Sequence, residues 1–194
     1  YVGKVAAWIC VRLDDGLESY PKPRRIREAE AEVIAREAKR LLDAAGDAAS
    51  IGVITFYSAQ RDLILEKLAR LGVVENGEIT PEYSRNRHGE ERLRVGTVDA
   101  FQGKEFDVVL LSIVRASKKV IPTNAEMEKR EAALNSKYGH LRLSNRMNVA
   151  MSRQRNLLIT VGAIAMANTQ EAKEAVPALH NFLTLCGGQY GCIR

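Results

Sequence analysis

The stretch TVDAFQGKEFDVVLLSIVRA, residues 97–116, decides the fold class, because its second half is apolar at nearly every position. A strand without polar alternation is normally buried on both faces, as in a parallel sheet covered by helices. Two further apolar runs of strand length, IGVITFY (51–57) and NLLITVG (156–162), flank it along the chain. Together the three runs predict an α/β domain with a mostly parallel sheet flanked by helices.

Hydrophobic periodicity fills in the remaining elements of this domain. Five strands are expected in all, the other two at 5–13 and 93–98. Apolar residues recur at helical spacing in 24–46 and in 59–72, and each of these segments stops at a glycine. The polar segment 73–92 predicts a loop or a small excursion. Further helices are expected in the middle of a charged insertion at about 117–140, at 144–155 and at 177–188.

Composition sets limits on the class of protein. The 194 residues suit a single domain, and none of the apolar runs reaches the roughly 20 residues of a membrane span. A formal charge of +5 permits a polyanionic partner without requiring one. The three cysteines form no C-x-x-C and the three histidines have no ligand spacing, so no zinc site or disulfide framework is indicated. A cytoplasmic location is expected, or a nuclear one in a eukaryote.

Polar groups gather where the predicted strands meet their connections. Ligands of a parallel sheet bind beyond the carboxyl ends of its strands. We therefore expect a site built from the loops after Tyr57, Val98 and Arg115, and from the helix and loop before Asn156. The Gly103-Lys104 pair is not a nucleotide-triphosphate loop, because G-x-x-x-x-G-K-S/T occurs nowhere in the chain.

Three stretches with polar residues beside buried strands follow one another along the chain: IGVITFYSAQRDLI, VGTVDAFQGKEFDVVLLSIVRAS and GHLRLSNRMNVAMSRQRNLLITVG. In their order and residue types they resemble motifs IV, V and VI of the second RecA-like domain of superfamily 1 helicases. The likeness, to the branch that contains the nonsense-mediated decay helicase, runs from about Val5 to Gly162. It implies a RecA-like P-loop NTPase-type fold with three layers, α/β/α, over residues 1–194.

The resemblance implies two arginine fingers, Arg61 in motif IV and Arg153 in motif VI. A well-placed arginine neutralises charge on the transferred phosphoryl group and can be worth about 10³ to 10⁵ in rate. Arginine suits this role because its planar guanidinium stays charged and donates to two oxygens. Arg155 is the less favoured finger, because the family varies more at that position.

The resemblance also assigns nucleotide and strand contacts. Glu105 matches a carboxylate near the nucleotide sugar, and Gly103 a position where the backbone approaches the ligand closely. Gln60 matches a neighbour of the motif IV arginine and either orients Arg61 or lies on the helix surface. Thr97 matches a hydroxyl that contacts the nucleic-acid backbone, and Gln102 a residue that couples the strand to the nucleotide.

The chain departs from the family at several positions. His140 stands where a phenylalanine is common, and Arg27 replaces an asparagine that usually opens the first long helix, although Glu30 keeps the expected acid. Asp99 is expected to be structural and to tie its turn through neighbouring N–H groups. These departures affect the subfamily, and both predicted fingers are retained.

The phosphate loop and the magnesium-binding acidic strand belong to the first RecA-like domain, which is expected upstream of this chain. ATP and Mg²⁺ would be held mainly there, so this chain by itself should neither hydrolyse ATP nor unwind a duplex. Single-stranded DNA or RNA and the first RecA-like domain are the expected partners. Two alternatives stay open: a non-catalytic helicase-like module that binds nucleic acid or protein, and a small-molecule enzyme on a flavodoxin-like sheet.

Overall fold

A six-stranded sheet forms the centre of the computed structural model, which describes residues 1–19, 25–122 and 126–194. Its strands are β1 (Ala6–Cys10), β2 (Ile51–Thr55), β5 (Leu93–Thr97), β6 (Phe106–Ser112), β7 (Gln154–Gly162) and β8 (Gly191–Ile193). They lie in the order β5-β2-β6-β7-β1-β8, and every neighbouring pair is parallel. The predicted α/β class with a mostly parallel sheet is thereby confirmed.

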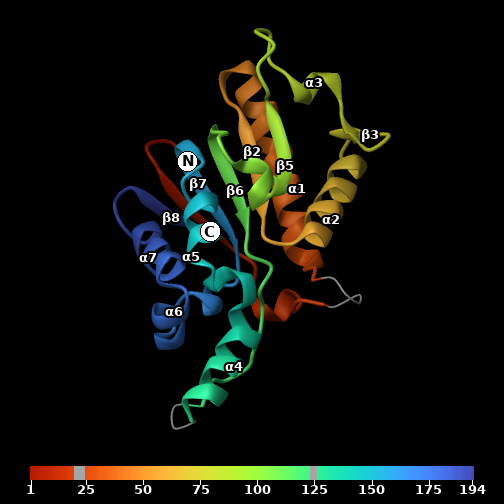
Figure 1. The fold of residues 1–194 in the computed structure, drawn as a ribbon. Helices are drawn as coiled ribbons and strands as arrows, with labels where there is room; N and C mark the ends of the chain where they lie inside the picture. Colours follow the sequence, from red (N-terminus) through yellow and green to blue (C-terminus); the bar gives the residue numbers. More distant parts are fainter. Residues whose placement is uncertain (20–24, 123–125) are drawn as a thin grey trace.

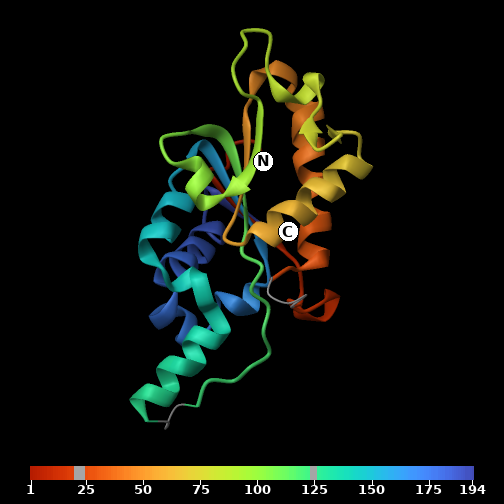
Figure 2. The same ribbon diagram turned by 45° about the vertical axis from the view of Figure 1, so that its right-hand side comes forward.

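Helices cover both faces of the sheet (Figures 1 and 2). One face carries α1 (Glu28–Ala45) and α2 (Ser58–Arg70), and the other carries α5 (Ser144–Ala150), α6 (Gln170–Ala175) and α7 (Pro177–Cys186). Helix α4 (Met127–Tyr138), in the predicted insertion, projects away from the sheet. The excursion expected at 73–92 holds the hairpin of β3 (Val74–Glu75) and β4 (Glu78–Ile79), followed by α3 (Pro81–Ser84).

The strand register defines two opposite edges. Thr55 lies beside both Thr97 and Ser112, so the residues that follow these three positions form the carboxyl edge of the sheet. Phe106 pairs with Gln154 at the other end, and the residues that precede β2, β5, β6 and β7 form the amino edge. Each predicted site residue can therefore be placed at one edge or the other.

The connection between β5 and β6, residues 98–105, runs from the carboxyl edge back to the amino edge without an α-helix. Its short 3-10 helix, Val98–Phe101, buries the Phe101 ring against the sheet. Two strand glycines make room for this packing. A Cβ on Gly52 would lie 2.9 Å from the Phe101 ring, and one on Gly96 would lie 2.9 Å from the Cβ of Ala100. The crossover packs closely against β2 and β5 because Gly52 and Gly96 have no side chains at the points of contact.

Two elements were not expected from the sequence. Strand β8 adds a sixth member to the sheet by pairing with β1, and α6 precedes the predicted closing helix. Both are short, and Gly188 and Gly191 make the β8 segment look like a turn. None of the helices in the described ranges combines the length and apolar character of a membrane span.

Candidate functional site

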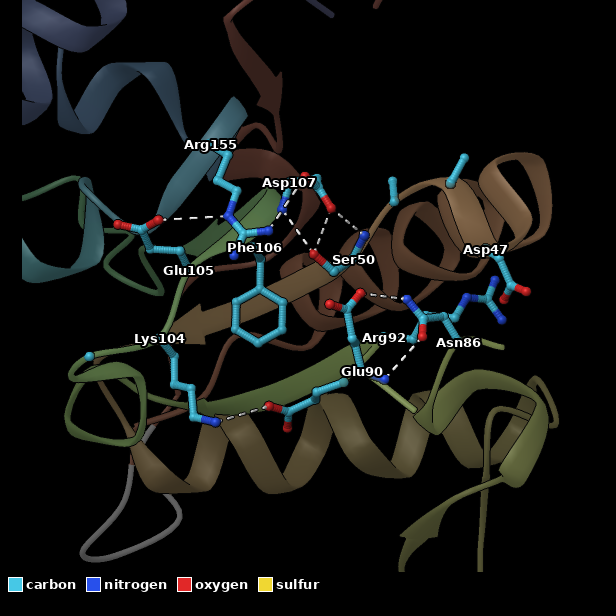
Figure 3. Close-up of a pocket in the computed structure, with 14 residues that line it drawn as sticks. Asp47, Ser50, Asn86, Glu90, Arg92, Lys104, Glu105, Phe106, Asp107 and Arg155 are labelled. Carbon is cyan, nitrogen blue, oxygen red and sulfur yellow. Dashed lines mark hydrogen bonds and ion pairs between the residues drawn. The ribbon is translucent and has the colours of Figure 1, made fainter. Parts of the chain in front are cut away.

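A cavity of about 320 Å³ opens at the amino edge, and motif V lines it with Gly103, Lys104 and Glu105. Figure 3 shows Glu105 and Arg155 pointing toward one another, with 3.6 Å between the Glu105 carboxylate and Nε of Arg155. Arg155 also lies 4.0 Å from the carboxylate of Asp107. Because Glu105 and Arg155 are each 56% exposed, these are loose surface pairs that a ligand can replace at little cost.

Arg153 lies beside this cavity, at the entry to β7. Its backbone carbonyl accepts a hydrogen bond from the Phe106 amide at 2.9 Å, which places it next to Glu105 along the edge. Nη2 of Arg153 donates to Oγ of Ser152 at 2.9 Å. Nε of Arg153 is buried and has no hydrogen-bond partner among the described residues. A half-buried guanidinium with an unused donor suits an anionic ligand.

Arg61 lies elsewhere. It belongs to the first turn of α2, where its amide donates to the Tyr57 carbonyl at 3.1 Å, and its guanidinium pairs with Asp62. This turn is at the carboxyl edge and on the α1–α2 face, whereas Arg153 is at the amino edge beside α5. The structure therefore does not bring the two predicted fingers together. The physical reason is simple: Arg61 follows a parallel strand and Arg153 precedes one.

The same reasoning corrects the expectation of one ligand-binding edge beyond the carboxyl ends. Residues 103–105 and the segment before Asn156 lie at the amino edge, because they lead into β6 and β7. Of the segments expected to form the site, the loops after β2, β5 and β6 do lie at the carboxyl edge. The predicted site residues thus form two groups at opposite ends of the strands.

Gln60 is completely buried, so of its two predicted roles the helix-surface one does not hold. Its Oε1 accepts from the Arg27 amide at 2.8 Å, and its Nε2 donates to the Arg27 carbonyl at 3.2 Å and to Ser112 at 3.3 Å. The side chain ties α2 to the start of α1 and so fixes the turn that carries Arg61. A direct contact of Gln60 with nucleotide stays a prediction.

A buried ion pair lies next to Gln60, and sequence reasoning gave it no role. The Arg27 guanidinium is 3.3 Å from the Glu30 carboxylate, and both side chains are fully buried. Glu30 also accepts hydrogen bonds from Ser112 and from the Val114 amide. Burial raises the pKa of Glu30, while Arg27 and these donors act in the opposite direction. The contact holds Val114 at φ 63°, a backbone conformation that β-branched residues rarely adopt.

The carboxyl edge carries a second cavity, of about 600 Å³, to which Thr97 contributes. Tyr57 and His140 stack in it with ring centroids 5.0 Å apart and planes 5° apart. Asp99 forms an ion pair across the rim with Arg146 of α5. The tie to the N–H groups of its own turn that was expected for Asp99 is not found among the described residues, and its exposed carboxylate pairs with this arginine instead.

Gln102 and Gly103 lie on the last part of the crossover. Gln102 is exposed, and Gly103 has a φ of 71°. A Cβ on Gly103 would meet nothing within 4 Å, so the positive φ alone explains the glycine within this chain. The close approach of a ligand to Gly103 stays a prediction. Among the described residues no cluster of three or more His, Cys, Asp or Glu could hold a metal ion.

Comparison with known proteins decides the family. A family model described as an AAA domain matches residues 5–165, most of the chain. This chain belongs to the superfamily 1 helicases, as their C-terminal RecA-like domain. The predicted resemblance to the branch that contains the nonsense-mediated decay helicase is confirmed.

The individual relatives that this domain matches are also named as helicases. The probable RNA helicase armi of Drosophila melanogaster is 29% identical over 78% of the chain, and the putative helicase MOV-10 of Gallus gallus is 29% identical over 84%. The putative ATP-dependent RNA helicase ECM32 of Saccharomyces cerevisiae is 35% identical over 58%. The chain spans only 10 to 15% of the length of these relatives.

Proposed function

We propose that this domain supplies one wall of the ATP cleft of a helicase motor at its amino edge and contacts single-stranded nucleic acid at its carboxyl edge. ATP and its Mg²⁺ are held mainly by a first RecA-like domain of the same protein. The observation that carries the proposal is the division of motif V, whose Gly103 and Glu105 lie beside Arg153 while Thr97 lies at the opposite edge.

At the amino edge, the donors and acceptors fit a nucleotide. Arg153 has a buried Nε without a partner in the described part of the chain, and its guanidinium can donate to phosphate oxygens. Glu105 is an exposed carboxylate that can accept hydrogen bonds from ribose hydroxyls. Arg153 neutralises charge on the transferred phosphoryl group, and Glu105 orients the sugar. Bound ATP supplies the phosphoryl group, and the chain's own residues supply charge and position.

At the carboxyl edge, Thr97 offers a hydroxyl to the nucleic-acid backbone, and Gln102 lies on the crossover that leads toward the nucleotide. Phosphate contacts of this kind position a strand without reading its sequence. Because residues 98–105 span both edges, a shift caused by ATP at one edge is passed directly to the strand at the other. The names of two relatives mention RNA, but the strand here is proposed only as single-stranded nucleic acid.

The separation of the two arginines favours Arg153 as the finger, and a finger role for Arg61 stays the competing prediction. The test makes the same change at both positions in the full-length protein, with ATP turnover and binding of a fluorescent ATP analogue as readouts. Arg153→Ala is expected to lower turnover by about 10³-fold or more while nucleotide binding persists. Arg61→Ala is expected to leave turnover near the wild-type value.

Near-normal turnover in Arg153→Ala would contradict the proposed finger. A collapse of turnover in both variants would contradict the division between the edges, since it would require Arg61 to act at the ATP site as well. Loss of nucleotide binding in Arg153→Ala would place this arginine in ground-state binding instead of catalysis.

A further inference from the structure

The stacked rings at the carboxyl edge have no role in the function proposed so far. Tyr57 packs against the hydrophobic core on one side, and His140 lies over it and is exposed. Both line the carboxyl-edge cavity to which Thr97 contributes, which is called the groove below. The order from the interior to solvent is therefore core, Tyr57, His140. An aromatic ring supported in this way presents a flat surface to the groove.

We propose that Tyr57 and His140 form a stacking platform for a nucleobase of the bound single strand. The inference rests on the proposed strand contact and names the part of the strand that this groove takes. Stacking on an aromatic ring accepts every base, because every base has a π face. Paired bases in a duplex do not present that face, so the platform selects unpaired nucleotides.

The platform is held rigidly from below. A Cβ on Gly139 would lie 3.1 Å from both Nη1 of Arg115 and the Tyr57 hydroxyl, and Gly139 has a φ of 52°. Glycine at this position allows the end of α4 to close onto Tyr57, which places His140 over the ring. The rings are thus in place before a base arrives, and little ordering cost is left for binding.

Arg115 fixes this arrangement and acts as a positioning residue. Its buried guanidinium donates to the last carbonyls of α4, from Ser136 and from Lys137, and lies 3.2 Å from the Glu18 carboxylate. A cation at the carboxyl end of a helix is favoured by the helix dipole. Arg115 therefore clamps α4 in the position that brings Gly139 and His140 against Tyr57.

The charges around the platform suit a strand of nucleic acid. Arg25 and Arg146 line the same groove, and Thr97 lies in the loop beside them. Cationic side chains that follow the phosphates, combined with aromatic rings that stack the bases, are the usual way to hold single strands without sequence preference. Asp99 pairs with Arg146, and Glu18 pairs with Arg25 at 3.1 Å, so both carboxylates limit the positive charge of the groove.

The test compares two labelled strands of equal length, one a homopolymer and one with the same phosphates but abasic sugars. The full-length wild-type protein is expected to bind the homopolymer more tightly. In His140→Ala the dissociation constant for the abasic strand divided by that for the homopolymer should fall by about 5- to 150-fold, the range given by one stacked base. Affinity for the abasic strand should change by less than about 2-fold, because its phosphate contacts remain. His140→Phe should keep the wild-type ratio.

An unchanged ratio in His140→Ala would overturn the platform, and so would an equal loss of affinity for both strands. Gly139→Ala gives an independent check, because it disturbs the seat of the ring and leaves both rings present. It should lower the ratio as well. Failure of the wild type to bind either strand would overturn the strand contact itself. Normal turnover in Arg153→Ala concerns only the ATP edge and leaves this result intact, so the two failures are distinguishable.

Discussion

The two edges of the sheet are built in opposite ways. At the amino edge, Glu105 and Arg155 are each more than half exposed and meet only through a loose pair of 3.6 Å. At the carboxyl edge, Arg115 and Glu30 are fully buried, and their hydrogen bonds brace the loops from below. One edge is an open surface of charged groups, and the other is a groove supported by the protein interior.

This difference matches the tasks proposed for the two edges. At a wall of the cleft that another domain completes, the charged side chains are best left solvated. They can then give up water and weak ion pairs and bind a ligand when the cleft closes. A groove that receives a strand gains from rings and loops already in place. Matched substitutions at the two edges test this contrast.

The largest effect on stability is expected from the buried acid at the carboxyl edge. Glu30→Gln leaves the Arg27 guanidinium buried without its counter-charge, which costs about 3–5 kcal/mol. The matched change at the amino edge, Glu105→Gln, should stay within about 0.5 kcal/mol, because the side chain is exposed. Hydrogen exchange of the β6 amides in the full-length protein measures both.

Equal losses in the two variants would remove the contrast between a braced and an open edge. A double-mutant comparison isolates the unpaired charge. In an Arg27→Met background, Glu30→Gln should cost less than it does in the wild type, because no buried guanidinium is then left without its counter-charge.

A smaller effect is expected from the crossover that joins the two edges. Gly52→Ala places a Cβ 2.9 Å from the Phe101 ring and 3.0 Å from Phe106, and overpacking of this kind costs about 1–3 kcal/mol. In a Phe101→Leu background the same change should cost less, because the smaller side chain leaves space. The two costs are compared through the exchange rates of the β2 amides. If Gly52→Ala costs the same in both backgrounds, the Phe101 ring is not the group for which Gly52 leaves space.

Much of this architecture could be predicted from local pattern. The buried strands at 51–57, 107–116 and 156–162 were found because their apolar runs reflect burial on both faces. The helix that ends at Gly46 was found because its apolar residues recur at helical spacing. Strand β8 was missed, because its three residues, Gly191–Ile193, begin with a glycine and are too few to show a periodicity.

Positions that depend on distant partners could not be predicted. Gln60 is polar and near a helix start, and nothing local shows that it is buried against Arg27. The separation of Arg61 from Arg153 did have a signal in the sequence. Arg61 follows an apolar run and Arg153 precedes one, and in a parallel sheet these positions lie at opposite ends. The residue types predicted which chemical groups the site contains. The edge of the sheet at which each group lies follows only from whether its residue precedes or follows a strand.

The smallest effect concerns the ion pair at the rim of the groove. Asp99→Asn removes the carboxylate that pairs with Arg146 and leaves its guanidinium available to a phosphate. Affinity for a single-stranded oligonucleotide should rise by about 2- to 5-fold, since exposed pairs are worth at most about 1 kcal/mol. The dependence of log K on log salt should steepen by about 0.7, the value for one added phosphate contact on a single strand.

Asp43→Asn is the matched control, because it makes the same charge change on α1, where Asp43 pairs with Lys39 away from the groove. Fluorescence anisotropy across a salt series should show a steeper slope for Asp99→Asn alone. An equal change in both variants would mean that net charge, and not Arg146, sets the affinity. No change in either would mean that Arg146 does not reach the strand.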